Sequence, residues 1–371
     1  MTRVLQIVTT MNRGGLETML MNYYRRVDRE LVQFDFLEHR AAESDYDAEI
    51  KELGGRIYRL PALNPISPSY LKALNCFFKE HKDYRVVHSH LDCMSAIPLG
   101  AAKKAGVPVR IAHAHSSSQD RNLKFPVKII CRMRIPLSAT RLLACGDTAG
   151  GWMFCGAPFE VLPNAIDTER FAFSETERAL KREELAIGDR LAVLHIGRFY
   201  WPKNHEFLLR IFAGIMKIRP DVVLLLAGEG ELLEATKSLA AKYNISDNVI
   251  FLGLRTDIPD LLSASDVMVF PSRYEGLGIS VIEAQASGLP CLVSDRVPGE
   301  AALTGLVSSM SLDESPEKWA EKAVEMSSVP RKSGADDVRA AGYDIQSAAK
   351  MLQSFYLRAG TGEEDAKLWQ R

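Results

Sequence analysis

The sequence has no cysteine pattern that would staple a secreted domain or hold zinc. Cysteine occurs six times, at positions 76, 93, 131, 145, 155 and 291. These positions form neither CxxC pairs nor the Cys/His spacing of a zinc site. We therefore expect reduced thiols, buried as small hydrophobic side chains, in a reducing compartment such as the cytosol.

Long hydrophobic runs are also missing. No stretch reaches the roughly 18 uninterrupted apolar residues that a membrane-spanning helix needs, and the apolar run in the N-terminal MTRVLQIVTT is too short for a secretory signal. We expect a cytoplasmic protein, either free or held at the inner face of the cell membrane.

Charge of one sign is not in excess. The 46 Lys and Arg residues nearly balance the 47 Asp and Glu residues, for a formal net charge of -1. The balance argues against an extended nucleic-acid footprint, and we expect no nucleic-acid partner. The chain also lacks internal repeats. Its 371 residues exceed what one hydrophobic core usually supports, so two domains are expected.

Strand patterns alternate with amphipathic helical patterns in two successive series, as in parallel sheets covered by helices. In the first series, strands are predicted near residues 3–9, 32–37, 56–60, 85–90, 108–114, 140–145 and 159–162. The second series contains the segments LAVLHIGR, VVLLLAGEG, NVIFLG, DVMVFPS and PCLVSD. We predict an α/β protein with two Rossmann-like domains, residues 1–163 and 164–343, joined at LPNAIDTERF.

Residues that directly follow the predicted strands carry the functional information, because open parallel sheets bind ligands beyond the carboxyl ends of their strands. After the first strand comes TTMNRGGLETML, with Gly14 and Gly15 where a helix begins. Glycine permits close backbone approach, and a helix N-terminus attracts anions. The pair can equally be a structural turn, since its spacing matches neither GxGxxG nor a P-loop.

The corresponding segment of the second series is HIGRFYWPKN, which carries Arg198 and Lys203 after a buried strand and Gly197. A planar guanidinium and a mobile ammonium suit a diphosphate, because the first grips two oxygens and the second supplies a point charge. Isolated cations are usually solvated surface groups. Because Arg198 and Lys203 follow a buried strand directly, a role in binding an anion is favoured over a purely solvated one.

The segment YEGLGISVIEAQASGLP places Glu275 in a predicted turn and Glu283 about one turn into a predicted helix. A carboxylate near a helix N-terminus can simply stabilise the helix, by roughly 0.3 to 1 kcal/mol. That explanation leaves Gly276 and Gly278 unexplained. Since a carboxylate accepts two hydroxyl hydrogen bonds, paired acids also suit the diols at the two ends of one sugar-containing ligand.

The chain resembles the retaining glycosyltransferases of family 4, which have the GT-B fold. The family pattern EGxGxxxxEAxAxGxP is matched by Glu275, Gly276, Gly278, Glu283, Ala284, Ala286, Gly288 and Pro290. The likeness covers nearly the whole chain, including HSH at 88–90, HAHS at 113–116, PNAID and GRFYWPKN. One departure is Ala165, where the family often has glycine, and it affects only a local turn.

The resemblance implies two Rossmann-like domains whose parallel sheets face each other across a cleft. The first domain would bind the acceptor and the second the nucleotide-sugar donor, with a C-terminal helix at about 344–371 packed onto the first domain. Because the two domains would close around the donor, water would be excluded from the reacting centre.

The resemblance also assigns roles to the donor-site residues. Glu283 would hold the ribose hydroxyls, Glu275 the hydroxyls of the donor sugar, and Arg198 with Lys203 the diphosphate. Main-chain groups would assist from Gly15 and from the turn Gly276, Leu277, Gly278 and Ile279. Gly253, Leu254 and Arg255 would cradle the base through main-chain contacts.

His115 would lie beside the donor sugar and the reacting centre. A histidine that follows a strand is more often structural, and His113 shares its strand face, so periodicity does not separate the two. The resemblance favours His115, and His90 is a weaker candidate from the neighbouring strand end.

The implied chemistry is transfer with retention, without a metal or other cofactor, in which the acceptor attacks the face that the diphosphate leaves. Asp45 and Asp47 do match the DxD pattern by which another glycosyltransferase fold binds manganese. They precede a predicted helix, where we expect them to act as caps.

A basic segment at 121–141, RNLKFPVKIICRMRIPLSATR, holds six Arg and Lys and no acid. It can be an ordinary helix with a solvated basic face, or an amphipathic helix that lies on an anionic membrane. Its place in the acceptor domain suggests a lipid-linked acceptor.

We therefore expect a hexosyltransferase that uses a nucleotide diphosphate sugar, with a UDP-sugar favoured, and a sugar or lipid-linked oligosaccharide acceptor in cell-surface or exopolysaccharide biosynthesis. Two alternatives remain open: a nucleotide-sugar epimerase of related fold, and a non-catalytic sugar-nucleotide-binding subunit.

Overall fold

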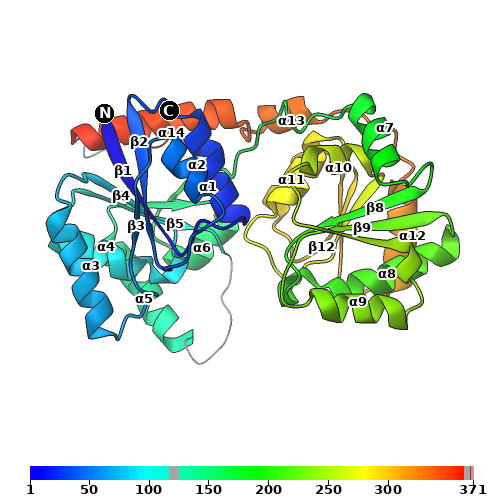
Figure 1. Cartoon of the computed structure of the whole chain (residues 1–371), viewed down its shortest axis with the longest axis horizontal. Helices are drawn as coiled ribbons and strands as arrows, with labels where there is room; N and C mark the ends of the chain where they lie inside the picture. Colours follow the sequence, from blue (N-terminus) through cyan, green and yellow to red (C-terminus); the bar gives the residue numbers. More distant parts are fainter. Residues whose placement is uncertain (117–124, 363–367, 369–371) are drawn as a thin grey trace. The chain divides into compact units, whose positions relative to one another are not determined.

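The computed structural model describes residues 1–116, 125–362 and 368. It divides into two compact units, Met1–Ala165 with Asp344–Arg371, and Ile166–Tyr343. We call them unit 1 and unit 2 and describe each by itself (Figure 1).

Unit 1 is built on a parallel sheet of seven strands in the order β3-β2-β1-β4-β5-β6-β7. The strands are Thr2–Val8 (β1), Val32–Glu38 (β2), Ile57–Arg59 (β3), Val86–Ser89 (β4), Val109–Ala114 (β5), Arg141–Ala144 (β6) and Glu160–Val161 (β7). Each lies within one or two residues of the predicted range. The prediction worked because runs such as VQFDFLE are buried along their whole length.

The helices of unit 1 cover both faces of this sheet. They are Gly15–Arg26 (α1), Asp47–Glu52 (α2), Pro68–Glu80 (α3), Ala96–Lys104 (α4), Phe125–Ser138 (α5), Asp147–Phe154 (α6) and Ile345–Thr361 (α14), with a 3₁₀ turn at Asp92–Ser95 (η1). α1 and α14 contact each other and share one apolar core with β1, β2 and β4.

The chain returns to unit 1 through α14, which begins at a well-formed cap. The Asp344 carboxylate accepts hydrogen bonds from the backbone N–H groups of Gln346 and Ser347. The helix ends at Thr361 because Gly362 adopts a left-handed conformation with φ of 94°. It is therefore shorter than the predicted 344–371. Residues 363–367 and 369–371 lie outside the described part of the chain.

Unit 2 has a parallel sheet of six strands in the order β10-β9-β8-β11-β12-β13. The strands are Leu191–Ile196 (β8), Val222–Ala227 (β9), Val249–Gly253 (β10), Val267–Phe270 (β11), Cys291–Ser294 (β12) and Val307–Met310 (β13). The sequence did not predict β13, because this edge strand reads VSSM and is only half buried.

The helices of unit 2 again form two layers (Figure 1). They are Glu175–Glu184 (α7), His205–Ile218 (α8), Leu233–Lys242 (α9), Ile258–Ala264 (α10), Ile279–Ala286 (α11), Pro316–Met326 (α12) and Ala335–Ala340 (α13), with 3₁₀ turns at Trp201–Lys203, Ser246–Asn248 and Gly299–Ala301. α8 and α12 pack on one face of the sheet around the fully buried Trp319. α7 and α10 pack together, as do α11 and α13.

Both sheets reverse their strand order once, between β1 and β4 in unit 1 and between β8 and β11 in unit 2. This is the doubly wound arrangement in which ligands bind beyond the carboxyl ends of the strands at the reversal. Among the described residues, no helix combines the length and the apolar character that crossing a bilayer requires.

Candidate functional site

The predicted donor-site residues of unit 2 gather at the reversal point of its sheet. Arg198 and Lys203 follow β8, while Glu275 follows β11, the strand paired with β8. Since the carboxyl ends of parallel strands meet at one edge, the fold brings these three side chains to the place where it predicts a ligand.

Lys203 and Glu275 form an ion pair, with 2.7 Å between Nζ and Oε1. The two side chains are only 12% and 13% exposed, and the same ammonium lies 4.4 Å from the centre of the Phe270 ring. The sequence analysis assigned Lys203 to the diphosphate of the donor and Glu275 to the hydroxyls of its sugar. Each charge neutralises the other, which keeps both side chains in place where little solvent reaches them.

The glycines around Lys203 make room for it. A Cβ on Gly197 would lie 2.9 Å from Cε of Lys203, so a larger residue there would displace the lysine side chain from its present path. A Cβ on Gly228, which has φ of +143°, would lie 2.2 Å from the carbonyl oxygen of Gly197. Gly230 similarly packs against the carbonyl of Phe199.

Sequence reasoning missed the Gly228–Gly230 loop, because AGEG was treated only as the end of a strand. The available signal was a pair of glycines directly after β9, which neighbours the reversal strand β8. The loop supports the backbone that carries Arg198. The Arg198 side chain itself is exposed, and within the described part of the chain it has no hydrogen bond or ion pair.

Glu283 is held on α11 with its side chain turned into the protein. The residue is 8% exposed, and burial raises the pKa of its carboxyl to about 8, against a smaller opposing effect of the Arg170 charge. No hydrogen bond reaches this carboxyl from another described residue. It is therefore a protonated, unpaired group at neutral pH, which is costly unless a ligand binds there.

The turn before α11 is shaped by Gly278, which caps the helix with φ of +87° and contributes no capping side chain. Leu277 is 2% exposed and anchors the turn in the core. At the start of α11 the N–H of Val281 donates to the carbonyl of Gly278, which leaves the N–H groups of Ile279 and Ser280 without an intrahelical partner and suited to donate to an anion.

The segment predicted to cradle the base begins where β10 ends. Gly253 has φ of +66°, and its carbonyl accepts a 2.9 Å hydrogen bond from the N–H of Gly228. Leu254 is 50% exposed. The Arg255 side chain is bound to Asp257 and Glu184, and the predicted main-chain contacts of this segment with the base stay a prediction.

In unit 1, Gly14 and Gly15 stand at the start of α1, as expected. A Cβ on Gly14 would lie 2.5 Å from a carboxylate oxygen of Glu17, whereas a Cβ on Gly15 would meet nothing within 4 Å. Glu17 thus lies beside the helix N-terminus that the sequence assigned to the diphosphate. The space next to Gly15 is open, so a ligand could approach the turn at this residue.

His115 belongs to an array of four neighbouring histidines at the ends of β4 and β5. The ring centres of His113 and His115 are 4.0 Å apart, and those of His88 and His90 are 4.1 Å apart. Nε2 of His115 lies 2.9 Å from Nδ1 of His90. The three histidines that the sequence treated as competitors are therefore one cluster. Burial lowers the pKa of every ring, that of His115 to about 3.

Asp92 fixes the backbone that carries His115, and sequence reasoning missed it. Its carboxylate accepts 2.9 Å hydrogen bonds from the backbone N–H of His115 and from the hydroxyl of Ser116. Asp92 itself has φ of +47°, a strained conformation for a residue other than glycine, and such strain is concentrated at functional sites.

Three histidines of the array are close enough to be considered as metal ligands. Ligand atoms of His88, His90 and His113 lie within 4.8 Å of one another. However, both ring nitrogens of His90 are already hydrogen-bonded, to His115 and to Gln6, so His90 has no ring nitrogen free for a metal in this arrangement.

The DxD acids do not cap a helix, and that expectation was wrong. Asp45 accepts a 2.9 Å hydrogen bond from the backbone N–H of Arg13. Asp47 is buried in an ion pair with Arg59. Tyr46 occupies the cap position of α2 and makes no side-chain cap bond. Both acids therefore serve tertiary contacts.

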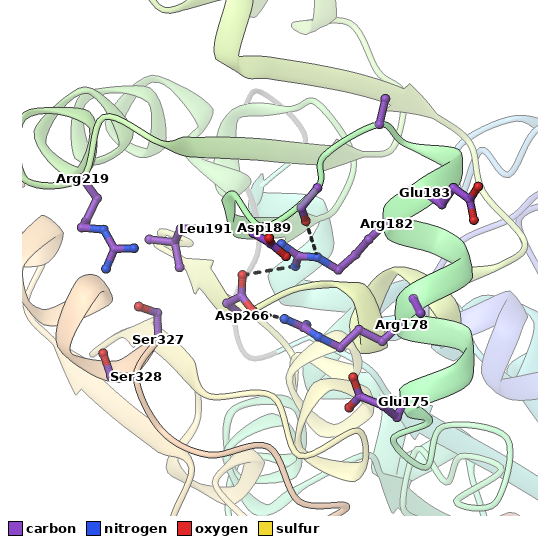
Figure 2. Close-up of a pocket in the computed structure, with 13 residues that line it drawn as sticks. Glu175, Arg178, Arg182, Glu183, Asp189, Leu191, Arg219, Asp266, Ser327 and Ser328 are labelled. Carbon is purple, nitrogen blue, oxygen red and sulfur yellow. Dashed lines mark hydrogen bonds and ion pairs between the residues drawn. The ribbon is translucent and has the colours of Figure 1, made fainter.

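A pocket of unit 2 lies away from these residues (Figure 2). It includes Leu191 and Asp266, which stand at the amino ends of β8 and β11. Asp266 is bound to Arg178 and Arg182 of α7, so these arginines already have a partner. The pocket is at the opposite edge of the sheet from Lys203 and Glu275.

The fold and the site together define a glycosyltransferase of the GT-B class. A family model described as Glycosyltransferase Family 4 matches residues 13–170, and one described as Glycosyl transferases group 1 matches residues 177–321. The putative glycosyltransferase EpsF of Bacillus subtilis is 38% identical, over 95% of this chain and 96% of the relative. The protein belongs to glycosyltransferase family 4.

Two further relatives have more specific names. The UDP-Gal:alpha-D-GlcNAc-diphosphoundecaprenol alpha-1,3-galactosyltransferase of Escherichia coli is 29% identical over 61% of this chain and 62% of its own. The capsular polysaccharide biosynthesis glycosyltransferase CapH of Staphylococcus aureus is 24% identical over 96% of this chain and 99% of its own.

Among solved structures, HepE from Anabaena in complex with UDP and glucose has a similar fold. It superposes with a TM-score of 0.76 over 95% of this chain and 99% of its own, at 17% identity. At that identity the likeness concerns the fold.

Proposed function

We propose that this protein is a retaining, metal-independent hexosyltransferase. It transfers a hexose from a UDP-sugar to a sugar or lipid-linked oligosaccharide in the biosynthesis of a cell-surface polysaccharide. The observation that carries the proposal is the set of Arg198, Lys203, Glu275 and Glu283, gathered from β8, β11 and α11 at the reversal point of the unit 2 sheet.

Each of these groups suits one part of a nucleotide sugar. The free guanidinium of Arg198 and the ammonium of Lys203 match two phosphate groups. Glu275 is placed to accept hydroxyl hydrogen bonds once a phosphate competes for Lys203. Glu283, buried and unpaired, is suited to a ribose diol, because a hydroxyl pair provides the partners that this carboxyl lacks.

In the transfer step, the bond between the anomeric carbon and the diphosphate oxygen breaks, and the electron pair leaves with the diphosphate. Arg198 and Lys203 stabilise the growing negative charge, an effect that is largest where water is excluded. The acceptor hydroxyl oxygen bonds the same face of the carbon and gives its proton to the departing diphosphate oxygen. Under this proposal His115 binds a hydroxyl of the sugar.

The donor and acceptor classes are supported by the relatives. A UDP-sugar donor and a lipid diphosphate acceptor appear in the name of the Escherichia coli relative, and capsular polysaccharide biosynthesis appears in that of CapH. The HepE structure contains UDP and glucose. These names support the proposal without specifying which sugar this chain transfers.

A panel of nucleotide sugars tests the reaction. Slow donor hydrolysis, with transfer when an acceptor is added, supports the glycosyltransferase. A donor converted to its epimer would instead indicate the epimerase, and donor binding without turnover a non-catalytic subunit. Retention is read from the anomeric configuration of the product by NMR, and full activity in EDTA is expected for a metal-independent enzyme.

We further propose that α5 holds the protein at the inner face of the cell membrane through anionic lipids. The predicted basic segment began at residue 121, and residues 121–124 lie outside the described part of the chain. Within α5, Ile130, Met133 and Leu137 are 57%, 65% and 68% exposed. Their spacing of three and four residues places them on one helix face. Arg134 is exposed beside them.

The basic residues of α5 are not equivalent. Arg132 lies 4.8 Å from the centre of the Trp152 ring and donates to the sulfur of Cys155, so it supports the packing of α5 onto α6. We expect Arg134→Glu with Met133→Ser to reduce sedimentation with liposomes that contain phosphatidylglycerol, with no effect on neutral liposomes. Unchanged sedimentation of this double variant would contradict membrane binding through α5.

A further inference from the structure

The hydrogen bonds of the histidine array extend to both ends of the chain. Gln6 lies in β1 and points to the same face as Val4 and Val8, because side chains alternate along a strand. It is fully buried. Its Oε1 lies 2.9 Å from Nε2 of His90, and its Nε2 lies 3.3 Å from the hydroxyl of Tyr356 in α14, which is 350 residues away in the sequence.

These contacts have a definite direction. The Gln6 carbonyl oxygen can only accept, so Nε2 of His90 must carry the proton. Since burial keeps the His90 ring neutral, its Nδ1 is then bare and accepts from Nε2 of His115 at 2.9 Å. His115 is also neutral, because burial lowers its pKa to about 3. Its single N–H is therefore on Nε2, and its Nδ1 is bare.

Tyr356 is the partner of the Gln6 nitrogen. Its hydroxyl accepts from the Gln6 N–H at 3.3 Å and shares a 2.6 Å hydrogen bond with Nδ1 of His88. With the amide reversed, Gln6 would donate to His90, and the proton on His115 would move to Nδ1. Without the tyrosine hydroxyl, no hydrogen bond among the described residues holds the Gln6 nitrogen end in place.

We propose that Gln6, His90 and Tyr356 are positioning residues that hold His115 in the tautomer with a bare Nδ1, which accepts a hydrogen bond from a substrate hydroxyl. Nδ1 of His115 is buried and has no partner among the described residues. Such an unpaired acceptor is unfavourable in the free protein, and a hydroxyl donor would satisfy it. Through Tyr356, the C-terminal helix α14 thus affects which ring nitrogen of His115 can accept a hydrogen bond.

This role for His115 rests on the proposed glycosyl transfer, but the tautomer does not. The tautomer is measured on full-length protein labelled with ¹⁵N-histidine, because two-bond proton–nitrogen correlations separate a protonated ring nitrogen from a bare one. We expect His115, assigned by comparison with His115→Asn, to be protonated on Nε2. A proton on Nδ1 in the wild type would overturn the proposal.

The decisive variant is Tyr356→Phe, which removes only the hydroxyl. We expect His115 to become a mixture of tautomers, with kcat reduced about tenfold and the KM for the donor little changed. The matched control is Tyr70→Phe, since Tyr70 is also buried and its hydroxyl is bonded to another histidine, His39, at 2.9 Å. That variant should keep a single His115 tautomer and the wild-type kcat.

A second variant separates tautomer control from loss of packing. Gln6→Leu keeps the apolar stem of the side chain but removes the oxygen that accepts from Nε2 of His90, so it should also give a mixture of His115 tautomers although Tyr356 is intact. A single tautomer in Tyr356→Phe or in Gln6→Leu would overturn the proposal. Titration with Zn²⁺ is a further test in the same NMR experiment. If one equivalent of Zn²⁺ shifts the His88, His90 and His113 resonances, the proposal is overturned, because metal binding would use the lone pairs assigned here to hydrogen bonds.

Discussion

At the scale of single residues, the Lys203–Glu275 pair is the feature most directly tied to turnover. Lys203→Met removes the ammonium but keeps an alkyl chain over Gly197 and Phe270. We expect kcat/KM to fall by about 2 to 4 kcal/mol in transition-state stabilisation, as when one charge-stabilising donor is lost elsewhere. Steady-state kinetics of donor hydrolysis measure this loss.

Lys237 offers a matched control for that substitution. It also pairs with a glutamate, Glu234, at 2.7 Å and lies 5.9 Å from the centre of a phenylalanine ring, but its side chain is 44% exposed on α9. Lys237→Met should leave kcat/KM unchanged. An equal loss in both variants would show that the effect does not arise from the donor site.

The Glu283 carboxyl predicts a pH dependence of stability in the ligand-free protein. Its pKa is raised to about 8 in the folded state, above the unfolded value near 4.5, so between these pH values the folded state binds more protons. Its contribution to the free energy of unfolding therefore falls as pH rises through this window, by up to about 1.4 kcal/mol per pH unit.

The glutamine in Glu283→Gln cannot ionise, so the variant should lack this pH-dependent contribution to the free energy of unfolding. Urea unfolding at pH 5 and at pH 9 measures the free energy of unfolding of both proteins. We expect the free energy of unfolding of the variant, relative to that of the wild type, to be higher at pH 9 than at pH 5. A difference that is the same at both would contradict the raised pKa.

At the scale of elements, two helix N-termini present glycines of different kinds. Gly15 of α1 has open space where a Cβ would lie, whereas Gly278 before α11 has φ of +87°. Gly15→Ala should leave the melting temperature nearly unchanged and weaken UDP binding, if its main chain approaches the diphosphate. Isothermal titration measures the affinity, and wild-type affinity would remove Gly15 from the donor site.

Gly278→Ala is the contrasting case. A Cβ there would meet Val297 at an ordinary 3.6 Å, so the cost is backbone strain, of order 1 to 3 kcal/mol. We expect a lower melting temperature together with weaker UDP binding, because the strain displaces the turn that carries Glu275. Full stability of this variant would contradict the backbone conformation of the turn.

At the scale of the whole molecule, donor binding should stabilise unit 2 selectively. UDP at about 100 times its Kd should add about 2.7 kcal/mol to the free energy of unfolding of the state that binds it. Hydrogen exchange should show the new protection at the start of α8 and at the start of α11, both in unit 2. The Lys203→Met variant should show less protection at the same concentration, and protection confined to α3–α6 would contradict the assignment of the donor site.

The sequence by itself predicted most of the strands and the two-domain α/β class, because hydrophobic period and glycine turns are local properties. It also singled out Arg198, Lys203, Glu275 and Glu283 by their order after the strands, and their role in donor binding stays a prediction. It did not reveal β13, whose VSSM lacks an apolar pattern, nor did it place Asp45 and Asp47 in their tertiary contacts.

Only the tertiary structure decided which of these groups meet. Lys203 pairs with Glu275 because β8 and β11 are neighbours in the sheet, although 72 residues separate the two in the chain. Gln6, His90 and Tyr356 come together because β1, β4 and α14 pack around one core. Such contacts depend on the pairing of distant elements, which no local pattern encodes.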